Sequence, residues 1–309
     1  MKLLILCNDR MALPATNRLL QSGIVAGIGM AERESEVHTI VRMLCANYNV
    51  SFRQFSKTTF TDDLKEWVST AAADAVLVKT FPWKIPANVL NVPKQGFINF
   101  HYAPLPAYRG PNPLFWMVKD GAKEAGVSVH RMTAEIDEGP ILFRSTIPIH
   151  TGVTFGMLCS QLGFNGMELT DKVLQALSAG NIAEQKQDVT GTNWYKRPSP
   201  ADLQIKWSAM DAYAIHRLVN ACNPWNKGAA ALLNGWMLGL TYVTPGHLKL
   251  ENEITPGTIL AIDEQNGLRI ACAGRTEIRV DVIYTEEGFM PGFALANFGV
   301  RPGTSFHLI

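Results

Sequence analysis

Residues 97–110 constrain this chain more than any other part of its sequence. An apolar run over 97–101 predicts a buried strand, and the two prolines and the glycine that follow predict a rigid loop at its end. Asn99 and His101 stand two apart in the strand, so both side chains project from one face. A buried amide or imidazole without a partner costs about 1 to 3 kcal/mol, so both side chains need partners. Because open α/β sheets bind ligands at the carboxyl ends of strands, we expect a site here.

The first two-thirds of the chain alternate short apolar runs with helical patterns. This alternation predicts βαβ units and an α/β, Rossmann-like fold with a mainly parallel sheet. The expected strands are residues 2–7, 24–30, 75–79, 97–100, 127–132 and 141–149. The expected helices are residues 32–46, 61–73 and 154–178.

The composition changes after Gly191. Residues 197–200 read Arg-Pro-Ser-Pro, which is typical of a linker, and a helix is expected over 211–221. Short strand-like segments separated by Gly and Pro then follow at close spacing, which is typical of a small OB-like β-barrel. We therefore expect one domain over residues 1–200 and a barrel-like domain over 201–309.

Overall charge and cysteine usage exclude several classes of protein. The formal net charge of the 309 residues is +1, which gives no electrostatic case for a polyanionic partner. No window approaches the roughly 18 consecutive apolar residues of a membrane span, so we expect a cytoplasmic protein that does not enter a membrane. The five cysteines are scattered and form no CxxC motif, so neither a disulfide framework nor a structural zinc site is expected.

Four sequence elements, taken in order, resemble the signature of the 10-formyltetrahydrofolate-dependent formyltransferases. This family includes methionyl-tRNA, glycinamide ribonucleotide and sugar N-formyltransferases. The resemblance extends over nearly the whole chain, because residues 220–229 resemble the start of the family's second domain and the tail resembles its C-terminal barrel. It implies a formyltransferase catalytic domain over residues 1–200. The elements are Asn99-x-His101, the Pro-Leu-Pro-x-Tyr-Arg-Gly loop that ends at Gly110, Gly126-Val-Ser-Val-His130, and Ile136-Asp137-x-Gly139-x-Ile141.

By this resemblance, Asn99, His101 and Asp137 match the family's catalytic Asn, His and Asp. Attack of an amine on a formamide carbonyl needs a donor for the oxyanion and an acceptor for the proton. Asn99 supplies N–H donors, and His101 donates to the oxyanion or handles the proton. Asp137, in a segment of turn composition, orients His101 or a water and accepts charge. No metal, covalent intermediate or serine nucleophile is implied.

The resemblance also implies 10-formyltetrahydrofolate as co-substrate, with an apolar slot for its pterin. The loop before the catalytic strand carries Trp83 beside Lys84, where the family commonly has smaller or aliphatic residues. The alternative for Trp83 is packing under a loop. The residues expected to line the folate site are Trp83, Ile85, Ala134, Glu135 and Ile136.

Tyr108, Arg109 and His130 are the expected contacts of the formyl acceptor. Arg109 can meet an anionic group of the acceptor, but a salt bridge that braces the loop is an equal alternative. His130 matches a histidine in part of the family, and it either acts directly or lines the cleft as a satisfied polar residue.

Three functions remain open. The first is formylation of an amine on a small molecule, such as a nucleotide-linked amino sugar; this is favoured because residues 31–37 are short and acidic, where relatives that act on tRNA carry a basic insertion. The alternative is a methionyl-tRNA formyltransferase. A non-catalytic paralogue that binds folate or nucleotide is the third, although a pure binder would not need Asn99, His101 and Asp137. Transfer of another folate-borne one-carbon unit and the oligomeric state stay open.

Overall fold

The computed structural model describes residues 1–33 and 35–307, which form two compact units. The first unit comprises residues 1–113, 124–148 and 159–196. The second comprises residues 114–123, 149–158 and those from 197 onward. Both units therefore combine segments that are separated in the sequence. The division near residue 200 inferred from composition remains a proposal.

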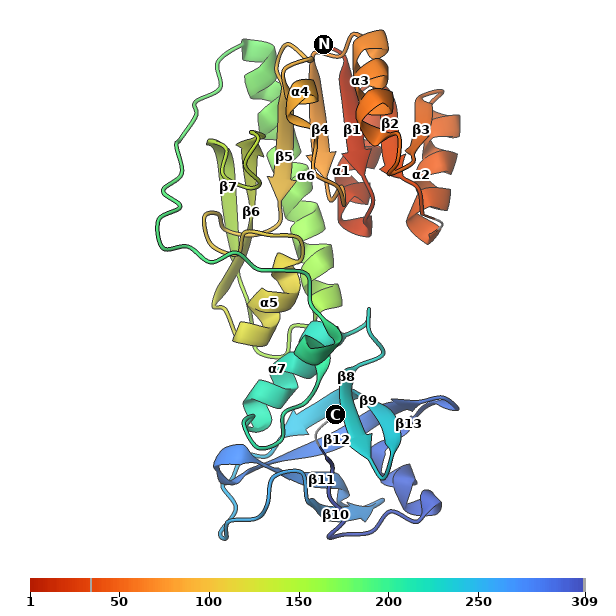
Figure 1. Cartoon of the computed structure of the whole chain (residues 1–309), viewed down its shortest axis with the longest axis vertical. Coiled ribbons are helices and arrows are strands. Elements are labelled where there is room, and N and C mark those ends of the chain that lie inside the picture. Colours follow the sequence, from red (N-terminus) through yellow and green to blue (C-terminus); the bar gives the residue numbers. More distant parts are fainter. Residues whose placement is uncertain (34, 308–309) are drawn as a thin grey trace. The chain divides into compact units, whose positions relative to one another are not determined.

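A seven-stranded sheet forms the centre of the first unit (Figure 1). Its strand order is β3-β2-β1-β4-β5-β6-β7; the first five strands in this order are parallel, and β6 runs antiparallel to β5 and β7. The predicted mainly parallel α/β sheet is confirmed. The strands are β1 (Leu3–Cys7), β2 (Val25–Ala31), β3 (Ser51–Phe55), β4 (Ala75–Lys79), β5 (Phe97–His101), β6 (Glu124–Arg131) and β7 (Ile141–Pro148).

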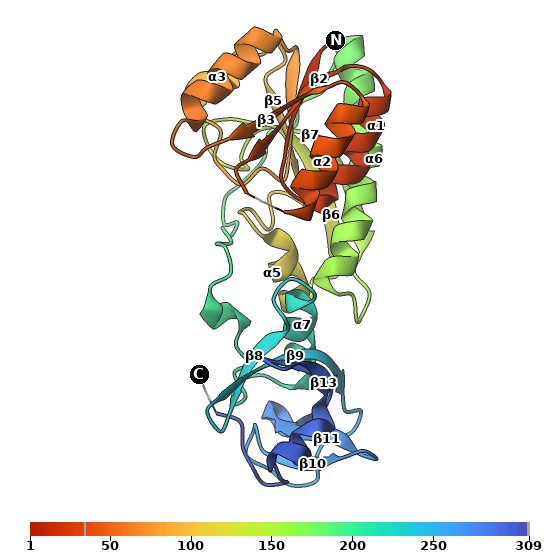
Figure 2. The same ribbon diagram turned by 90° about the vertical axis from the view of Figure 1, so that its right-hand side faces the viewer.

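Helices cover both faces of this sheet, with α1, α2 and α6 on one side and α3 on the other (Figure 2). The helix expected over residues 32–46 begins later than predicted, because the Ser35 side chain accepts a hydrogen bond from the His38 amide and caps the helix there; residue 34 of that range lies outside the described residues. The helices are α1 (Leu13–Gln21), α2 (Glu36–Asn47), α3 (Phe60–Ala71), α4 (Ala87–Leu90), α5 (Pro113–Asp120) and α6 (Phe155–Ala179).

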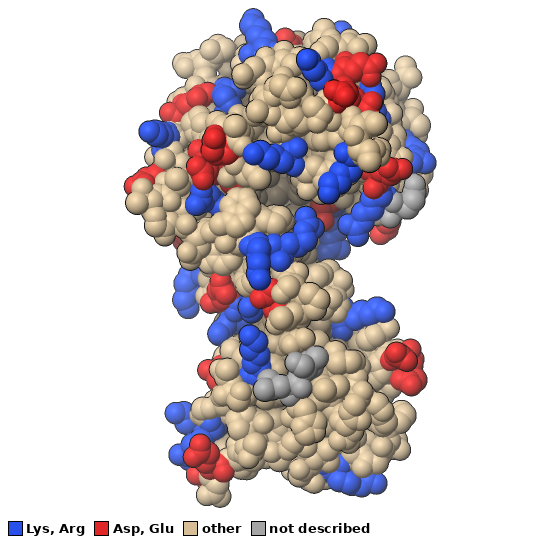
Figure 3. Space-filling model, viewed as in Figure 1, with Lys and Arg blue, Asp and Glu red and all other residues tan. Residues whose placement is uncertain are grey.

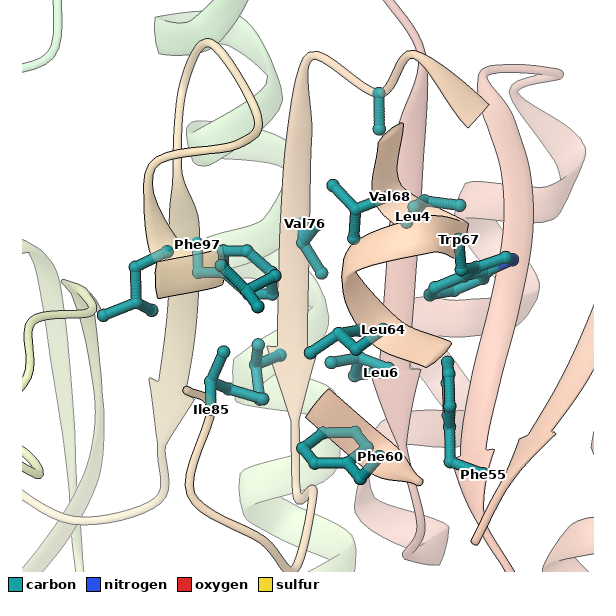
Figure 4. Close-up of a cluster of buried hydrophobic side chains, with 14 residues drawn as sticks. Leu4, Leu6, Phe55, Phe60, Leu64, Trp67, Val68, Val76, Ile85 and Phe97 are labelled. Atoms are coloured by element: carbon teal, nitrogen blue, oxygen red, sulfur yellow. The ribbon is translucent and has the colours of Figure 1, made fainter. Parts of the chain in front are cut away.

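The α3 face of the sheet is sealed by an aromatic and aliphatic cluster (Figure 4). Phe55 meets Phe60 and Trp67 edge to face, with ring centroids 5.5 and 5.4 Å apart. Leu64 belongs to the same cluster, with none of its surface exposed. The cluster joins residues of β1, β4 and β5, and so holds in place the strand that carries Asn99 and His101.

The second unit contains a six-stranded antiparallel sheet and α7 (Ala212–Cys222), which packs on β9. Its order is β10-β11-β12-β9-β8, with β13 paired to β12. The expected antiparallel β domain is confirmed. These pairings are compatible with an OB-like barrel but do not close one, so the barrel stays a prediction. The strands are β8 (Ala229–Leu233), β9 (Trp236–Pro245), β10 (Ile259–Asp263), β11 (Gly267–Cys272), β12 (Thr276–Thr285) and β13 (Gly288–Pro291).

Within the described residues, no helix combines the length and the apolar character needed to cross a membrane. All five cysteines are buried and carry free thiols.

Candidate active site

The end of β5 and the neighbouring strand β6 bring four predicted residues together. Antiparallel pairing of the two strands sets Asn99 opposite His130 and His101 opposite Ser128. Asp137 arrives from the turn between β6 and β7. We call Asn99, His101, His130 and Asp137 the site cluster. His101, His130 and Asp137 are buried, and Asn99 is half-buried.

His130 fixes the carboxamide of Asn99. The Asn99 Nδ2 lies 3.0 Å from His130 Nε2, and His130 Nδ1 lies 3.1 Å from the carbonyl oxygen of Arg131. An imidazole whose Nδ1–H donates to a carbonyl presents Nε2 as an acceptor, so both contacts are satisfied by one neutral tautomer. The nitrogen of Asn99 is thereby held toward the site cluster, with one of its two hydrogens left over.

His101 is oriented by the backbone of the loop that follows its strand. Its Nε2–H donates to the carbonyl oxygen of Tyr108 at 2.9 Å, and its Nδ1 lies 3.5 Å from Asp137 Oδ1. Burial lowers the pKa of His101 below its ordinary 6.5, although the Asp137 charge and the Tyr108 carbonyl oppose this shift. The ring is therefore neutral at pH 7. Nδ1 is the nitrogen that can take up a proton, and Asp137 can stabilise the resulting imidazolium.

Asp137 is buried but held as a carboxylate. Burial acts to raise its pKa, yet His101, His130 and the Gly110 amide together lower it from 3.8 to about 2. The Gly110 N–H donates to Oδ2 at 3.0 Å, and His130 Nε2 lies 3.7 Å from Oδ1. Because His101 is itself neutral at pH 7, the Gly110 bond is the contact that favours the charged form there.

Glycines allow the two loops of the site to approach closely. A Cβ at Gly110 would lie 2.0 Å from the carbonyl oxygen of Tyr195, and Gly110 has a φ of 117°. A Cβ at Gly139 would lie 1.7 Å from the carbonyl oxygen of Arg131. No other residue fits these two positions without moving backbone.

The predicted acceptor contacts already have partners in the protein. Arg109 forms an ion pair with Glu138 and donates to the Thr192 carbonyl at 3.4 Å, which is the loop-bracing arrangement considered above. The Tyr108 ring stacks on Tyr195 with centroids 4.9 Å apart. A direct role of Tyr108, Arg109 or His130 in binding an acceptor remains a proposal.

The predicted folate contacts fall into two groups. Trp83 packs edge to face on Phe60 at 5.1 Å, and Ile85 is buried in the core cluster of Figure 4, so both side chains contribute to the sheet packing. Residues 134–136 form an exposed turn, with the Ile136 side chain 44% exposed. The turn is adjacent to Asp137 and accessible to a ligand. Contact of either group with folate is untested.

Two structural partners of the site had no assigned role in the sequence analysis. Ser128 accepts from the Leu105 amide at 2.9 Å and donates to the Ala103 carbonyl at 2.8 Å, and so ties β6 to the proline loop. Gln187 donates to carbonyls on both sides of the Asp137 turn. Ser128 belongs to the Gly126–His130 motif, from which its importance could have been inferred. Gln187 lies in a polar stretch without periodicity, and no sequence pattern marks it.

The arrangement supplies the three groups that acyl transfer from an amide requires. Asn99 presents an N–H donor where an oxyanion can form, His101 presents a neutral base, and Asp137 presents a fixed negative charge beside that base.

Comparison with known families identifies the fold. A model described as "Formyl transferase" matches residues 22–174, and one described as "Formyl transferase, C-terminal domain" matches residues 198–290. A methionyl-tRNA formyltransferase of Trichlorobacter lovleyi is 30% identical over 75% of this chain and 71% of its own length. The chain belongs to the formyl transferase family. The resemblance inferred from the four motifs is thus confirmed.

Two further relatives cover nearly the whole chain. A methionyl-tRNA formyltransferase of Geotalea uraniireducens is 28% identical over 98% of this chain and 97% of its own length. The solved structure of an N-formyltransferase from Helicobacter canadensis, in complex with folinic acid and dTDP-3-aminofucose, matches with a TM-score of 0.67 at 16% identity over 90% of this chain and 98% of that one. At this identity the structural match establishes a shared fold.

Proposed function

We propose that this chain transfers a formyl group from 10-formyltetrahydrofolate to a primary amine, with Asn99, His101 and Asp137 as catalytic residues. The observation that carries the proposal is the site cluster: a neutral imidazole lies 3.5 Å from a buried carboxylate, beside an oriented carboxamide. The formyl-folate complex of the structural relative supports the choice of donor.

In the proposed reaction the amine nitrogen attacks the formyl carbon, and the carbonyl oxygen becomes an oxyanion that accepts a hydrogen bond from Asn99. The nitrogen loses a proton to Nδ1 of His101, and the imidazolium is stabilised by Asp137. The oxyanion then re-forms its carbonyl as the bond to N10 of the folate breaks, and the proton passes from His101 to that nitrogen. The products are the formylated amine and tetrahydrofolate.

Methionyl-tRNA is the first candidate acceptor. Relatives that match nearly the whole of this chain carry that activity in their names, which supports tRNA better than the small amine that the sequence analysis placed first.

A small-molecule amine is the second candidate, because the charge distribution favours it. Residues 197–309 hold nine Lys and Arg against ten Asp and Glu, and on the face in Figure 3 the charged side chains of the second unit are scattered over a mostly uncharged surface. A tRNA-binding surface usually gathers basic residues that neutralise phosphates. The structural relative bound to an amino-sugar nucleotide supports the same candidate.

The test is to incubate the protein with 10-formyltetrahydrofolate and, in separate reactions, methionylated initiator tRNA and a set of nucleotide-linked amino sugars. Release of tetrahydrofolate and formylation of each acceptor are followed together. We expect the tRNA to be the better acceptor; a higher kcat/KM for an amino sugar would establish the second candidate. No formylation of any amine, by protein shown to bind folate, would contradict the proposed reaction.

A salt series tests how a tRNA acceptor is held by the protein. If the tRNA is held mainly at its aminoacyl end, kcat/KM should change less than about tenfold between 50 and 200 mM salt, whereas 6 to 10 phosphate contacts would reduce binding by roughly 10³- to 10⁵-fold.

A further inference from the structure

We propose that Gln187 is a positioning residue, which holds the turn at Asp137 so that its carboxylate faces His101 and His130. The inference rests on the catalytic role given to Asp137 in the proposed function. Gln187 lies in the segment of the first unit that follows α6, fifty residues beyond Asp137 in the sequence.

The side-chain amide of Gln187 joins both sides of this turn. Its Nε2 lies 3.0 Å from the carbonyl oxygen of Asp137 and 2.6 Å from that of Gly139. A carboxamide nitrogen carries two hydrogens, so both are donated to the turn. Since Gln187 is only 8% exposed, water competes little for these bonds.

The backbone of Asp137 needs such support. Its φ is 59°, in the left-handed region, where a residue other than glycine persists only when its surroundings hold it. Gly110 holds the turn through the carboxylate, and Gln187 holds it through the carbonyl. The direction of the carboxylate is therefore set from two sides.

Gln187 is itself anchored by backbone bonds that do not involve Asp137. Gln185 and Ile141 exchange two backbone hydrogen bonds, of 2.8 and 2.9 Å, which attach the segment to the start of β7. Further along, the Tyr195 amide donates to the Arg109 carbonyl at 2.8 Å. The segment thus spans from β7 to the loop that orients His101, with Gln187 between its two attachments.

A glutamine at position 187 leaves one buried oxygen without a partner. This unfavourable feature indicates that the two N–H donors of the side chain have a role. Gln187 Oε1 is buried and has no hydrogen-bond partner among the described residues. A buried acceptor in this state is destabilising, and a methionine of similar size would avoid that cost. Since packing alone would favour the methionine, the two donated bonds explain the glutamine.

The test compares Gln187→Met and Gln187→Glu, which keep the length of the side chain and remove both donors. Gln185→Met is the matched control, because the Gln185 side chain is exposed in the same segment. We expect kcat for formyl transfer to fall at least ~10-fold in both Gln187 variants, with KM for the folate within about threefold of wild type and kcat of the control within about twofold.

Coupling to Asp137 distinguishes positioning from general damage. In an Asp137→Asn background, where the carboxylate is already absent, Gln187→Met should cause no further loss of kcat. The same loss in both backgrounds would overturn the proposal, as would near-wild-type kcat of Gln187→Met, or unfolding of both Gln187 variants at the assay temperature. An active Asp137→Asn protein would instead overturn the proposed role of Asp137 and the inference with it.

Discussion

Two buried polar clusters lie on opposite faces of strand β5 and differ in the partners that they give to an ionisable group. Asn99 and His101 project from one face of β5, toward Asp137. Phe100 projects from the other, where Lys79 of β4 lies over it. Lys79 is fully buried, and its Nζ donates to Thr170 of α6 at 2.8 Å. We call Lys79, Thr170 and Phe100 the lysine cluster.

The difference lies in the partners of each ionisable group. Asp137 keeps its charge, with a pKa lowered to about 2, because His101, His130 and the Gly110 amide together outweigh the effect of burial. Lys79 meets a hydroxyl and the face of an aromatic ring at 3.1 Å, and burial lowers its pKa well below 10.5. The neighbours of a buried group thus decide how far burial disfavours its charge, and in the site cluster they favour the charged form.

The largest effect should come from removing members of the site cluster that act in the transition state. We expect His101→Ala and Asn99→Ala each to lower kcat by about 10²-fold or more, with folate binding largely retained. Steady-state kinetics and a folate titration check this. The exposed His150 and Asn88 provide matched controls, and their alanine variants should behave as wild type. Near-full turnover of either cluster variant at saturating substrate would remove it from the mechanism.

Replacing the charge at Asp137 should have the next largest effect. We expect Asp137→Asn to lower kcat by about 10- to 10²-fold, because the imidazolium of His101 loses its counter-charge. The exposed Asp62→Asn is the control. Unaltered turnover of the Asp137 variant would show that the charge has no role.

The same variant tests the pKa of Asp137 through stability. Since the folded-state pKa is lowered from 3.8 to about 2, the carboxylate contributes about 2 kcal/mol to the free energy of unfolding. This contribution is present above pH 3.8 and is lost as the pH falls through about 2. Denaturant melts of wild type and Asp137→Asn should therefore differ at pH 7 and converge in acid. A constant difference would contradict the lowered pKa.

A smaller effect on rate is expected from pH. Burial lowers the pKa of His101 from its ordinary value of 6.5, so the imidazole begins to take up a proton only at a lower pH. The acidic limb of kcat/KM should accordingly have its midpoint below pH 6.5, and a midpoint at pH 7 or above would contradict the assignment. The unfolded chain takes up this proton more readily than the folded one, so His101 also reduces stability as the pH falls below 6.5.

Lys79→Met should leave the rate within about twofold of wild type and raise stability. The methionine fills a similar volume without a buried amine, and Thr170 still donates to the Gly166 carbonyl at 2.7 Å. Because the folded-state pKa of Lys79 is lowered, the unfolded chain binds the proton more readily, and the gain in stability should grow as the pH falls from 10.5 toward the folded-state pKa. Thermal melts at several pH values measure it, with exposed Lys65→Met as control. A lower Tm would mean that Lys79 stabilises the sheet.

Hydrophobic periodicity predicted the sheet because β1, β4 and β5 are short, almost wholly apolar runs bounded by turn residues. β3 escaped the sequence analysis because Ser51–Phe55 is an edge strand with exposed and half-buried polar residues. α1 escaped it because the helix follows a short 3₁₀ turn and has a proline at its start. Local patterns thus identify apolar strands better than a polar edge strand such as β3.

The site was predictable where several of its groups belong to one local motif. Asn99 and His101 share a strand, and Asp137 shares a turn with Gly139, so these local motifs and the family resemblance that they carry placed the three residues together. The bond from Gln187 to Asp137 joins residues fifty positions apart through a side chain in an irregular segment. No periodicity or turn chemistry marks such a contact, and only the folded chain brings it about.

The central claim is that the site cluster moves a formyl group from folate to an amine. The direct test is to supply 10-formyltetrahydrofolate labelled in its formyl carbon, with methionyl-tRNA and amino-sugar acceptors, to wild type and to His101→Ala. Mass spectrometry of the acceptor then locates the label. We expect wild type to leave one labelled formyl group on the acceptor nitrogen and His101→Ala to leave at most about a hundredth as much in the same time. Label that remains on the folate with wild type, or equal transfer by the variant, would contradict the account.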